Sequence, residues 1–105
     1  TRTQLGAGEM KRKTQAERDY HELVASLPCV LCDALGQPQD SRTEVHHIRV
    51  GQGMAQRAGH FLVLPLCYSC HRQKHGIHGD RSRFKMAKVT ELDLLDRVIE
   101  GIANA

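Results

Sequence analysis

Apolar side chains recur at helical spacing near the start and near the end of the chain. After Thr14 they fall on one face of a predicted helix, at Tyr20, Leu23, Val24 and Leu27. Thr14 with Glu17 three residues later predicts a capping box at the start of this helix, and Pro28 predicts its end. Near the C-terminus, Thr90 predicts the N-cap of a last helix, with Asp93 three residues on. The apolar stripe of this helix comprises Leu92, Leu95, Val98, Ile99 and Ile102.

The stretch between these helices has the pattern of short strands and turns. Residues 44–49 contain two β-branched side chains and predict a strand, and glycines predict a loop over residues 50–60. Residues 61–64 predict a second short strand, which Pro65 either ends or places at the edge of a sheet.

Two shorter helical segments are predicted after the second strand. The first runs to about His75, where Gly76 stops it, and the second forms another turn over residues 80–88. The polar segment over residues 33–41 contains glycine and proline and predicts a loop.

Composition limits the size of the core. Only 4% of the 105 residues are aromatic and none is Trp, so a core built from them cannot be large. A small domain buries a small share of its surface and often needs a staple. We therefore expect one small domain over residues 15–105, preceded by a flexible basic tail over residues 1–14 that contains Lys11-Arg12-Lys13.

The hydropathy pattern argues against a membrane protein. No apolar run approaches the roughly 20 residues that span a bilayer. No charged-then-apolar leader precedes the first helix either. We therefore expect a cytoplasmic protein without membrane contacts.

Basic charge is concentrated in the middle of the chain. Residues 49–88 contain eight Lys or Arg and one acidic residue, a net charge of +7, whereas residues 15–48 carry −4 and residues 89–105 carry −3. A basic segment of this kind favours a polyanion partner such as DNA, although an ordinary solvated surface would give the same count.

Two Cys-x-x-Cys pairs predict a metal site. The pairs are Cys29 with Cys32 and Cys67 with Cys70, and 34 residues separate them. Two-residue spacing lets both thiolates of a pair bind one tetrahedral ion, and two such knuckles complete a four-sulfur zinc site. Disulfides are the alternative, but the absence of a secretory signal disfavours them, and a redox motif would not need a second copy. We expect Zn²⁺ to join the end of the first helix to the second strand.

Six of the seven histidines lie within residues 46–78. His71 and His75 are four residues apart, so on a helix they share one face and can bind one metal ion. His46 and His47 are adjacent on a predicted strand and point to opposite faces, so one can bind a metal while the other acts beside it. His21 is interpreted as an ordinary exposed or hydrogen-bonded histidine.

The order of these motifs resembles the HNH endonucleases and their ββα-metal fold. The resemblance covers roughly residues 29–75 and depends on Glu44-Val-His-His-Ile48 and Cys67-Tyr-Ser-Cys-His-Arg-Gln-Lys-His75. The later words His75-Gly-Ile-His-Gly-Asp80 and Thr90-Glu-Leu-Asp-Leu94 look closer still to the Ref-like branch. Those proteins are phage recombination-enhancement nucleases, and their founding member works with RecA filaments.

The resemblance implies roles for the histidines. His46 and the helical His71 and His75 would hold a divalent catalytic metal such as Mg²⁺, Mn²⁺ or Zn²⁺, and His47 would be the general base. One residue departs from the family pattern, because Leu62 occupies the position of the middle Asn and the only Asn of the chain is Asn104. A backbone carbonyl, Gln52, Gln56 or His60 would have to orient the base instead.

Three basic residues lie close in sequence to these histidines. Arg49, Arg72 and Lys74 are therefore candidates for contacts with the phosphates of DNA. Together these features predict a small zinc-stapled α+β domain with a ββα-metal core, flanked by N- and C-terminal helices. The predicted function is DNA cleavage, and the resemblance implies a link to RecA in a bacterial cell and a phage or prophage origin. The alternative is a non-catalytic zinc module that binds DNA or protein, with the histidines forming a second structural site.

Overall fold

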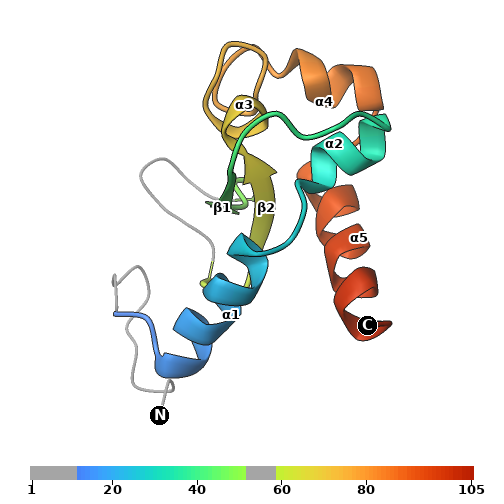
Figure 1. Ribbon diagram of the computed structural model, residues 1–105. Coiled ribbons are helices and arrows are strands. Elements are labelled where there is room, and N and C mark those ends of the chain that lie inside the picture. The colour runs from blue at the N-terminus through green and yellow to red at the C-terminus, as the bar shows by residue number, and fades with distance from the viewer. Residues whose placement is uncertain (1–11, 52–58) are drawn as a thin grey trace.

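The computed structural model describes residues 12–51 and 59–105, which form a two-stranded antiparallel sheet surrounded by helices. Figure 1 shows α3 and α4 at one end of the sheet, α1 at the other and α5 alongside. The protein is therefore α+β, as predicted. The elements are α1 (Gln15–Ala25), α2 (Val30–Leu35), β1 (Thr43–His47), β2 (Val63–Cys67), α3 (Tyr68–His71), α4 (Ser82–Ala87) and α5 (Glu91–Ala103).

Two predicted segments lie mostly outside the described residues. Residues 1–11 include most of the expected basic tail, and residues 52–58 include Gln52 and Gln56, two of the residues proposed to replace the middle Asn. Within the described residues, no helix is both long and apolar enough to cross a membrane.

Helix α1 begins as predicted but buries a face that only partly overlaps the predicted one. The side chain of Thr14 accepts the Glu17 N–H at 3.1 Å, and the Glu17 carboxylate accepts the Thr14 N–H at 2.7 Å, which completes the capping box. The buried residues are Glu17, His21 and Val24, whereas Leu23 is 42% exposed. Because α1 packs against the sheet through this partly polar face, a histidine of the helix is brought to the end of β1.

Helix α5 also begins with the predicted capping box, formed by Thr90 and Asp93. The buried side chains of α5 differ in part from the predicted apolar stripe. Leu94, Leu95 and Val98 are buried, whereas Leu92 and Ile99 are about half exposed. The helix therefore contacts the core through a face rotated from the predicted one toward Glu91 and Leu94.

The sheet pairs β1 with β2, so that Val45 lies opposite Pro65 and His46 opposite Leu64. Every residue of β2 is buried, whereas Phe61 and Leu62, which the sequence places in this strand, are exposed. The strand therefore begins two residues later than predicted. Proline is tolerated inside β2 because each strand of a two-stranded sheet has one unpaired edge.

Helix α2 is an addition to the predicted elements. The Sγ of Cys29 accepts the Cys32 N–H at its start, and Gly36 ends it in the left-handed conformation at φ 69°. Buried side chains of α2, α5 and β2 pack together around the cysteines, and the largest of them are Leu31, Leu64, Leu66 and Leu94.

Helix α3 is shorter than the sequence predicts and ends at His71. The next residues fold back, since the N–H of Ile77 donates to the Cys70 carbonyl and that of His78 to the His71 carbonyl. Gly76 permits this return, because a Cβ there would lie 2.5 Å from the Cys70 carbonyl oxygen. The predicted helix to His75 is therefore wrong in length, and His71 and His75 do not share a helical face.

Candidate active site

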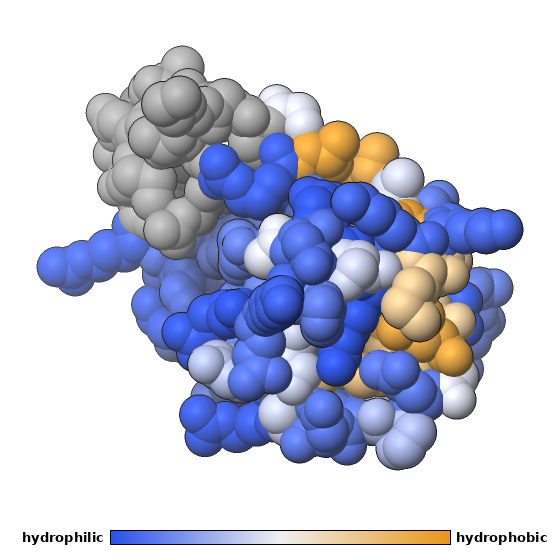
Figure 2. Space-filling view, turned by 90° about the horizontal axis from the view of Figure 1, so that it is seen from above, coloured by the Kyte–Doolittle hydropathy of each residue, from blue (hydrophilic) through white to orange (hydrophobic). Residues whose placement is uncertain are grey.

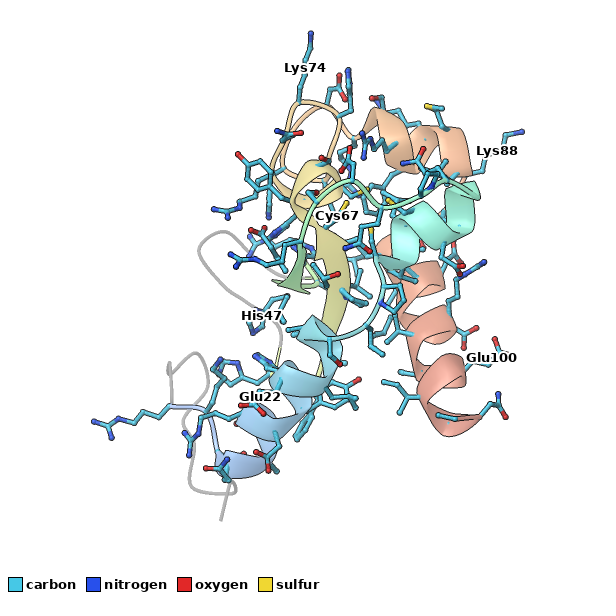
Figure 3. All side chains as sticks on the ribbon, viewed as in Figure 1. Glu22, His47, Cys67, Lys74, Lys88 and Glu100 are labelled. Carbon is cyan, nitrogen blue, oxygen red and sulfur yellow. The ribbon has the colours of Figure 1, made fainter. Side chains whose placement is uncertain are left out.

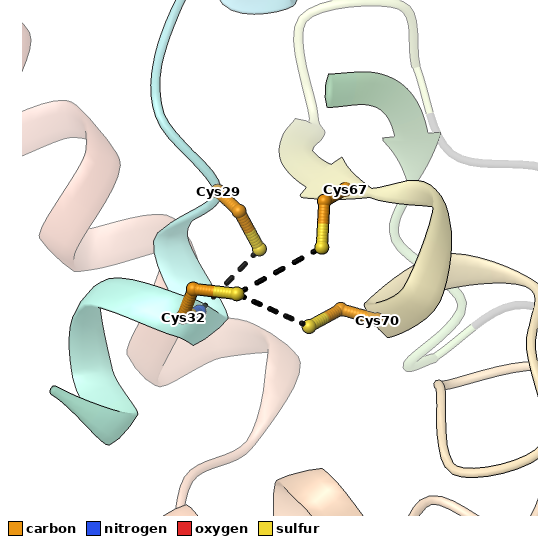
Figure 4. Close-up of side chains that lie close together, drawn as sticks. All are labelled: Cys29, Cys32, Cys67 and Cys70. Atoms are coloured by element: carbon orange, nitrogen blue, oxygen red, sulfur yellow. Dashed lines mark hydrogen bonds between the residues drawn. The ribbon is translucent and has the colours of Figure 1, made fainter. Parts of the chain in front are cut away.

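Four cysteine sulfurs converge between α2 and the junction of β2 with α3 (Figure 4). All four side chains are buried, and the Cys32 Sγ lies 3.8 Å from the Cys67 Sγ and 3.7 Å from the Cys70 Sγ. These separations far exceed the roughly 2.05 Å of a disulfide bond. They match the edge, about 3.8 Å, of a tetrahedron with metal–sulfur bonds of about 2.3 Å. The cluster could therefore hold a structural metal ion.

The electrostatics of the cysteine cluster favour a bound cation. A hydrogen bond from Cys70 lowers the pKa of the Cys29 thiol to about 5, whereas burial raises that of Cys32 to about 11. Contact with Cys29 likewise raises the pKa of Cys70. Without a cation, the raised pKa values of Cys32 and Cys70 disfavour several thiolates in one cluster. A bound divalent ion would offset the repulsion between these thiolates. Arg83 places a further positive charge beside the sulfurs, because its Nη1 donates to the Cys70 Sγ at 3.3 Å.

A group of three histidines, His46, His71 and His78, forms the first histidine cluster. Each offers a ring nitrogen within 4.8 Å of the others. The ring centroids lie 5.0 Å apart for His46 and His71 and 4.8 Å apart for His71 and His78. Burial lowers the pKa of both His71 and His78, which favours the neutral imidazole that metals bind.

A buried carboxylate holds His46 in place. Nε2 of His46 donates to Glu91 Oε2 at 2.6 Å, and the same carboxylate accepts the N–H groups of Arg49 and Val50. Burial alone would raise the pKa of Glu91, but these hydrogen bonds outweigh it and lower the pKa. Glu91 is therefore an anion that orients His46 from the first residue of α5.

A second carboxylate holds His71. Nδ1 of His71 donates to Glu44 Oε1 at 2.8 Å, and Arg72 donates to both oxygens of Glu44. The hydrogen bond from Arg72 lowers the pKa of Glu44, so this group is also an anion. Carboxylates that bind the outer nitrogen of a histidine are typical of metal ligands, because they fix the ring and raise its basicity.

His75, which the sequence predicts as a ligand, lies apart from the first histidine cluster. Its Nδ1 lies 2.9 Å from Ser82 Oγ and 3.2 Å from an oxygen of Asp80, and its side chain is 53% exposed. The early end of α3 explains this position. His78 is instead the third histidine of the cluster, a position that a continuous helix would have given to His75.

His47 points to the other face of β1, as predicted from the alternation of a strand. Its Nε2 lies 3.1 Å from Nδ1 of His60. Together with His21, these two residues form a second group of three histidines. His21 donates from Nε2 to the His60 carbonyl at 2.6 Å. His21 is hydrogen-bonded, as expected, but it is buried and its ring lies beside that of His47.

Residues from both faces of β1 line one open surface depression of about 240 Å³. His46, His71 and His78 line it together with His47 and the two residues Val45 and Arg49. Figure 3 shows His47 beside the sheet, between the strands and α1. The depression therefore brings a possible metal-binding group and a possible general base to one place.

The three predicted phosphate-binding residues differ in their surroundings. Arg49 lines the depression. Arg72 is 58% exposed, binds Glu44 and stacks over Tyr68 at 5.2 Å. Lys74 is exposed on the loop after α3 and points away from the molecule (Figure 3). The face at this end of the protein is mostly hydrophilic (Figure 2), as a surface that contacts phosphates must be.

Besides His78, sequence reasoning missed two residues of this site, Glu91 and Glu44. Glu91 has the ordinary sequence signal of an acid in the first turn of a helix. Glu44 stands out only as an acid beside the His46-His47 pair. Neither signal indicates a contact across 45 or 27 positions of the chain.

A comparison with protein-family models gives a match over residues 13–92, to a family described as recombination enhancement, RecA-dependent nuclease. The matched segment includes both cysteine pairs, all seven histidines and Glu91. Neither the curated proteins nor the solved structures gave a match.

Proposed function

The chain belongs to the family of recombination-enhancement, RecA-dependent nucleases, and on this premise we propose that it is a metal-dependent DNA endonuclease of the HNH type with a ββα-metal core. The observation that carries this proposal is the first histidine cluster, held by two carboxylates, with His47 on the rim of the same depression. Metal-assisted hydrolysis of a phosphodiester combines a metal ion and a general base at one phosphate.

In this proposal β1, α3 and the loop after α3 supply the ligands of the catalytic metal. His46 donates through Nε2 to Glu91 and His71 through Nδ1 to Glu44, which leaves the opposite nitrogen of each ring as the one with a lone pair. His78 completes the set in place of His75. A divalent cation bound there would offset the negative charge that develops on the phosphate and on the leaving 3′ oxygen.

His47 acts as the general base. With Nε2 donating to Nδ1 of His60, Nδ1 of His47 is the nitrogen that takes a proton from the attacking water. His60 then orients the base, as the middle Asn of the family pattern would. An ordinary imidazole has a pKa near ~6.5 and can act as a base at neutral pH.

The four cysteines hold a structural Zn²⁺. The sulfur–sulfur separations and the lack of an oxygen donor in the cluster suit zinc rather than magnesium. This ion would fasten α2 to the end of β2 and the start of α3, and so fix the strand that pairs with β1 and the helix that carries His71.

The partners in this proposal are DNA and a RecA filament, as the family description implies, and the reaction takes place in the cytoplasm of a bacterial cell. The competing function is a non-catalytic zinc module in which the histidines form a second structural site. Structural sites are closed by protein ligands, whereas the three histidines lie at an open depression and leave a position for a substrate oxygen.

The phosphate contacts predict a salt dependence. If Arg49, Arg72 or Lys74 neutralises a phosphate, replacing it with alanine should flatten the slope of log affinity against log salt by about one. Arg97 is the matched control, because it is equally exposed but lies on α5 and pairs with Asp33. Its alanine variant should retain the wild-type slope. An unchanged slope in all three test variants would place the DNA elsewhere on the protein.

The catalytic metal is tested by cleavage of RecA-coated DNA over a range of Mg²⁺ or Mn²⁺ concentrations. EDTA should stop cleavage by the wild type. His78→Ala should raise the metal concentration needed for half-maximal rate by at least about 10-fold, with part of the rate restored at high metal. His75→Ala should stay near wild type. The reverse pattern would restore His75 as the ligand, and cleavage that is insensitive to EDTA would contradict the proposed chemistry.

A further inference from the structure

A second histidine cluster lies on the opposite face of β1 and comprises His21, His47 and His60. The three residues come from α1, from β1 and from the loop before β2, and each offers a ring nitrogen within 4.8 Å of the others. Their ring centroids are separated by 5.4 Å, 5.2 Å and 5.8 Å. Three imidazoles from distant parts of the chain thus face one another at the edge of the proposed active site.

We propose that the second histidine cluster binds a zinc ion, separate from the catalytic metal, and that this ion inhibits the nuclease by binding the general base. The inhibition rests on the proposed function of His47, whereas the binding of zinc does not. Zinc is the appropriate ion, because three imidazoles form one of its common protein ligand sets while Mg²⁺ prefers oxygen.

The rearrangement needed for binding is small. Nitrogens on a tetrahedral zinc ion lie about 3.4 Å apart, given bonds of about 2.0–2.1 Å. Nε2 of His47 and Nδ1 of His60 are already 3.1 Å apart. His21 must release either the His60 carbonyl or the ammonium of Lys13, which lies 3.2 Å from its Nδ1. Lys13 is exposed and can turn into solvent.

The second histidine cluster should bind zinc more weakly than the first. In the first cluster, Glu91 and Glu44 bind the outer nitrogens of two ligands. In the second cluster, the ring nitrogens of His21 instead contact the His60 carbonyl and the Lys13 ammonium. Loss of such outer contacts typically lowers metal affinity 10–100-fold. Zinc should therefore fill the second cluster last, which suits an inhibitory ion.

Inhibition follows from the chemistry of His47. With zinc bound at Nε2, the single proton of the neutral ring is on Nδ1, so Nδ1 has no lone pair to take the proton of the water. The ion also adds positive charge beside the base, which further disfavours its protonation. Saturating zinc should thus lower the cleavage rate about as far as loss of the base, by on the order of 10²-fold or more.

Zinc binding is measured first, by calorimetry and by competition with a chromogenic chelator. Protein whose cysteine site is already filled is titrated with Zn²⁺. His21→Gln should bind one equivalent fewer than wild type, because glutamine keeps a donor for the His60 carbonyl but is a poor zinc ligand. His71→Gln should lose a different and tighter equivalent. His75→Gln, the matched control, should bind as wild type does, and circular dichroism should show that each variant is folded.

Cleavage is then measured at saturating Mg²⁺ with increasing Zn²⁺, and each protein is normalised to its own rate without zinc. His21→Gln and, as a second variant, His60→Gln should need at least about 10-fold more zinc for half inhibition than wild type or His75→Gln. Equal inhibition of all four proteins would mean that zinc only displaces magnesium from the first cluster, and would overturn the inference.

The binding data separate this inference from the proposed function. An unchanged zinc equivalent in folded His21→Gln and His60→Gln would refute the second site while leaving the metal and base of the nuclease intact. A lost equivalent together with zinc inhibition that these variants relieve would establish it. A lost equivalent without inhibition would refute the regulatory role of the site.

Discussion

Cys29→Ser should leave the chain largely unfolded at temperatures where the wild type is native. The binding free energy of a structural zinc site contributes directly to folding, and apparent values near 10–16 kcal/mol are typical of small zinc modules. Small domains have a net stability of only about 5–15 kcal/mol. Losing one of four sulfurs at the centre of this core therefore removes an amount of free energy comparable to the whole stability. Thermal melting followed by circular dichroism measures the effect.

Val30→Ala is the matched control for this prediction, because Val30 is the next residue of the chain and is also buried. It should lower the free energy of unfolding by about 2 kcal/mol, as an ordinary core truncation does, and leave a cooperative transition. Strong chelation of the wild type should reproduce the cysteine variant. A protein that keeps its melting curve after verified zinc removal would show that the cysteines are ordinary core residues.

The parts of the fold that the sequence predicts correctly depend on local signals. Thr14 with Glu17 and Thr90 with Asp93 mark helix starts because a capping box involves residues only three positions apart. The Cys-x-x-Cys spacing likewise fixes the geometry of each sulfur pair locally. Strand alternation correctly separates His46 from His47, which belong to different histidine clusters.

The errors arise where distant segments meet. The apolar spacing of α1 predicts a buried Leu23, but tertiary packing buries Glu17 and His21 instead. Likewise, the helix expected to reach His75 ends at His71, because the following loop folds back onto the Cys70 carbonyl. That return exchanges His75 for His78 in the first histidine cluster. A sequence window cannot show such a return, since it depends on where the cysteines anchor the chain.

The contacts of Glu91 and Glu44 explain why their importance is visible only in the folded protein. Each carboxylate reaches a histidine from another element, and each is held as an anion by further hydrogen bonds. The site thus consists of ligands predicted from motif spacing and of supporting anions placed by tertiary structure. Likewise, His47 is predicted from its motif, whereas its contact with His60 is made only in the folded chain.

His47→Ala should nearly abolish cleavage while preserving both the fold and the binding of the catalytic metal. Loss of a general base typically lowers the rate 10²–10⁴-fold, because the attacking water then has no positioned proton acceptor. His47 is only partly buried and lies outside the first histidine cluster, so its removal should change neither the melting temperature nor the catalytic-metal affinity appreciably. Cleavage of RecA-coated DNA at saturating Mg²⁺, without added zinc, measures the rate, and calorimetry measures metal binding.

His46→Ala provides the matched comparison, because it removes the adjacent imidazole from the same strand. It should weaken binding of the catalytic metal, and high metal concentration should restore part of its rate, whereas no metal concentration should rescue His47→Ala. Added imidazole should instead restore part of the activity of His47→Ala by supplying the missing base. A fully active His47→Ala protein would exclude the proposed mechanism. Loss of the catalytic metal in His47→Ala with its retention in His46→Ala would mean that the two adjacent histidines have exchanged roles.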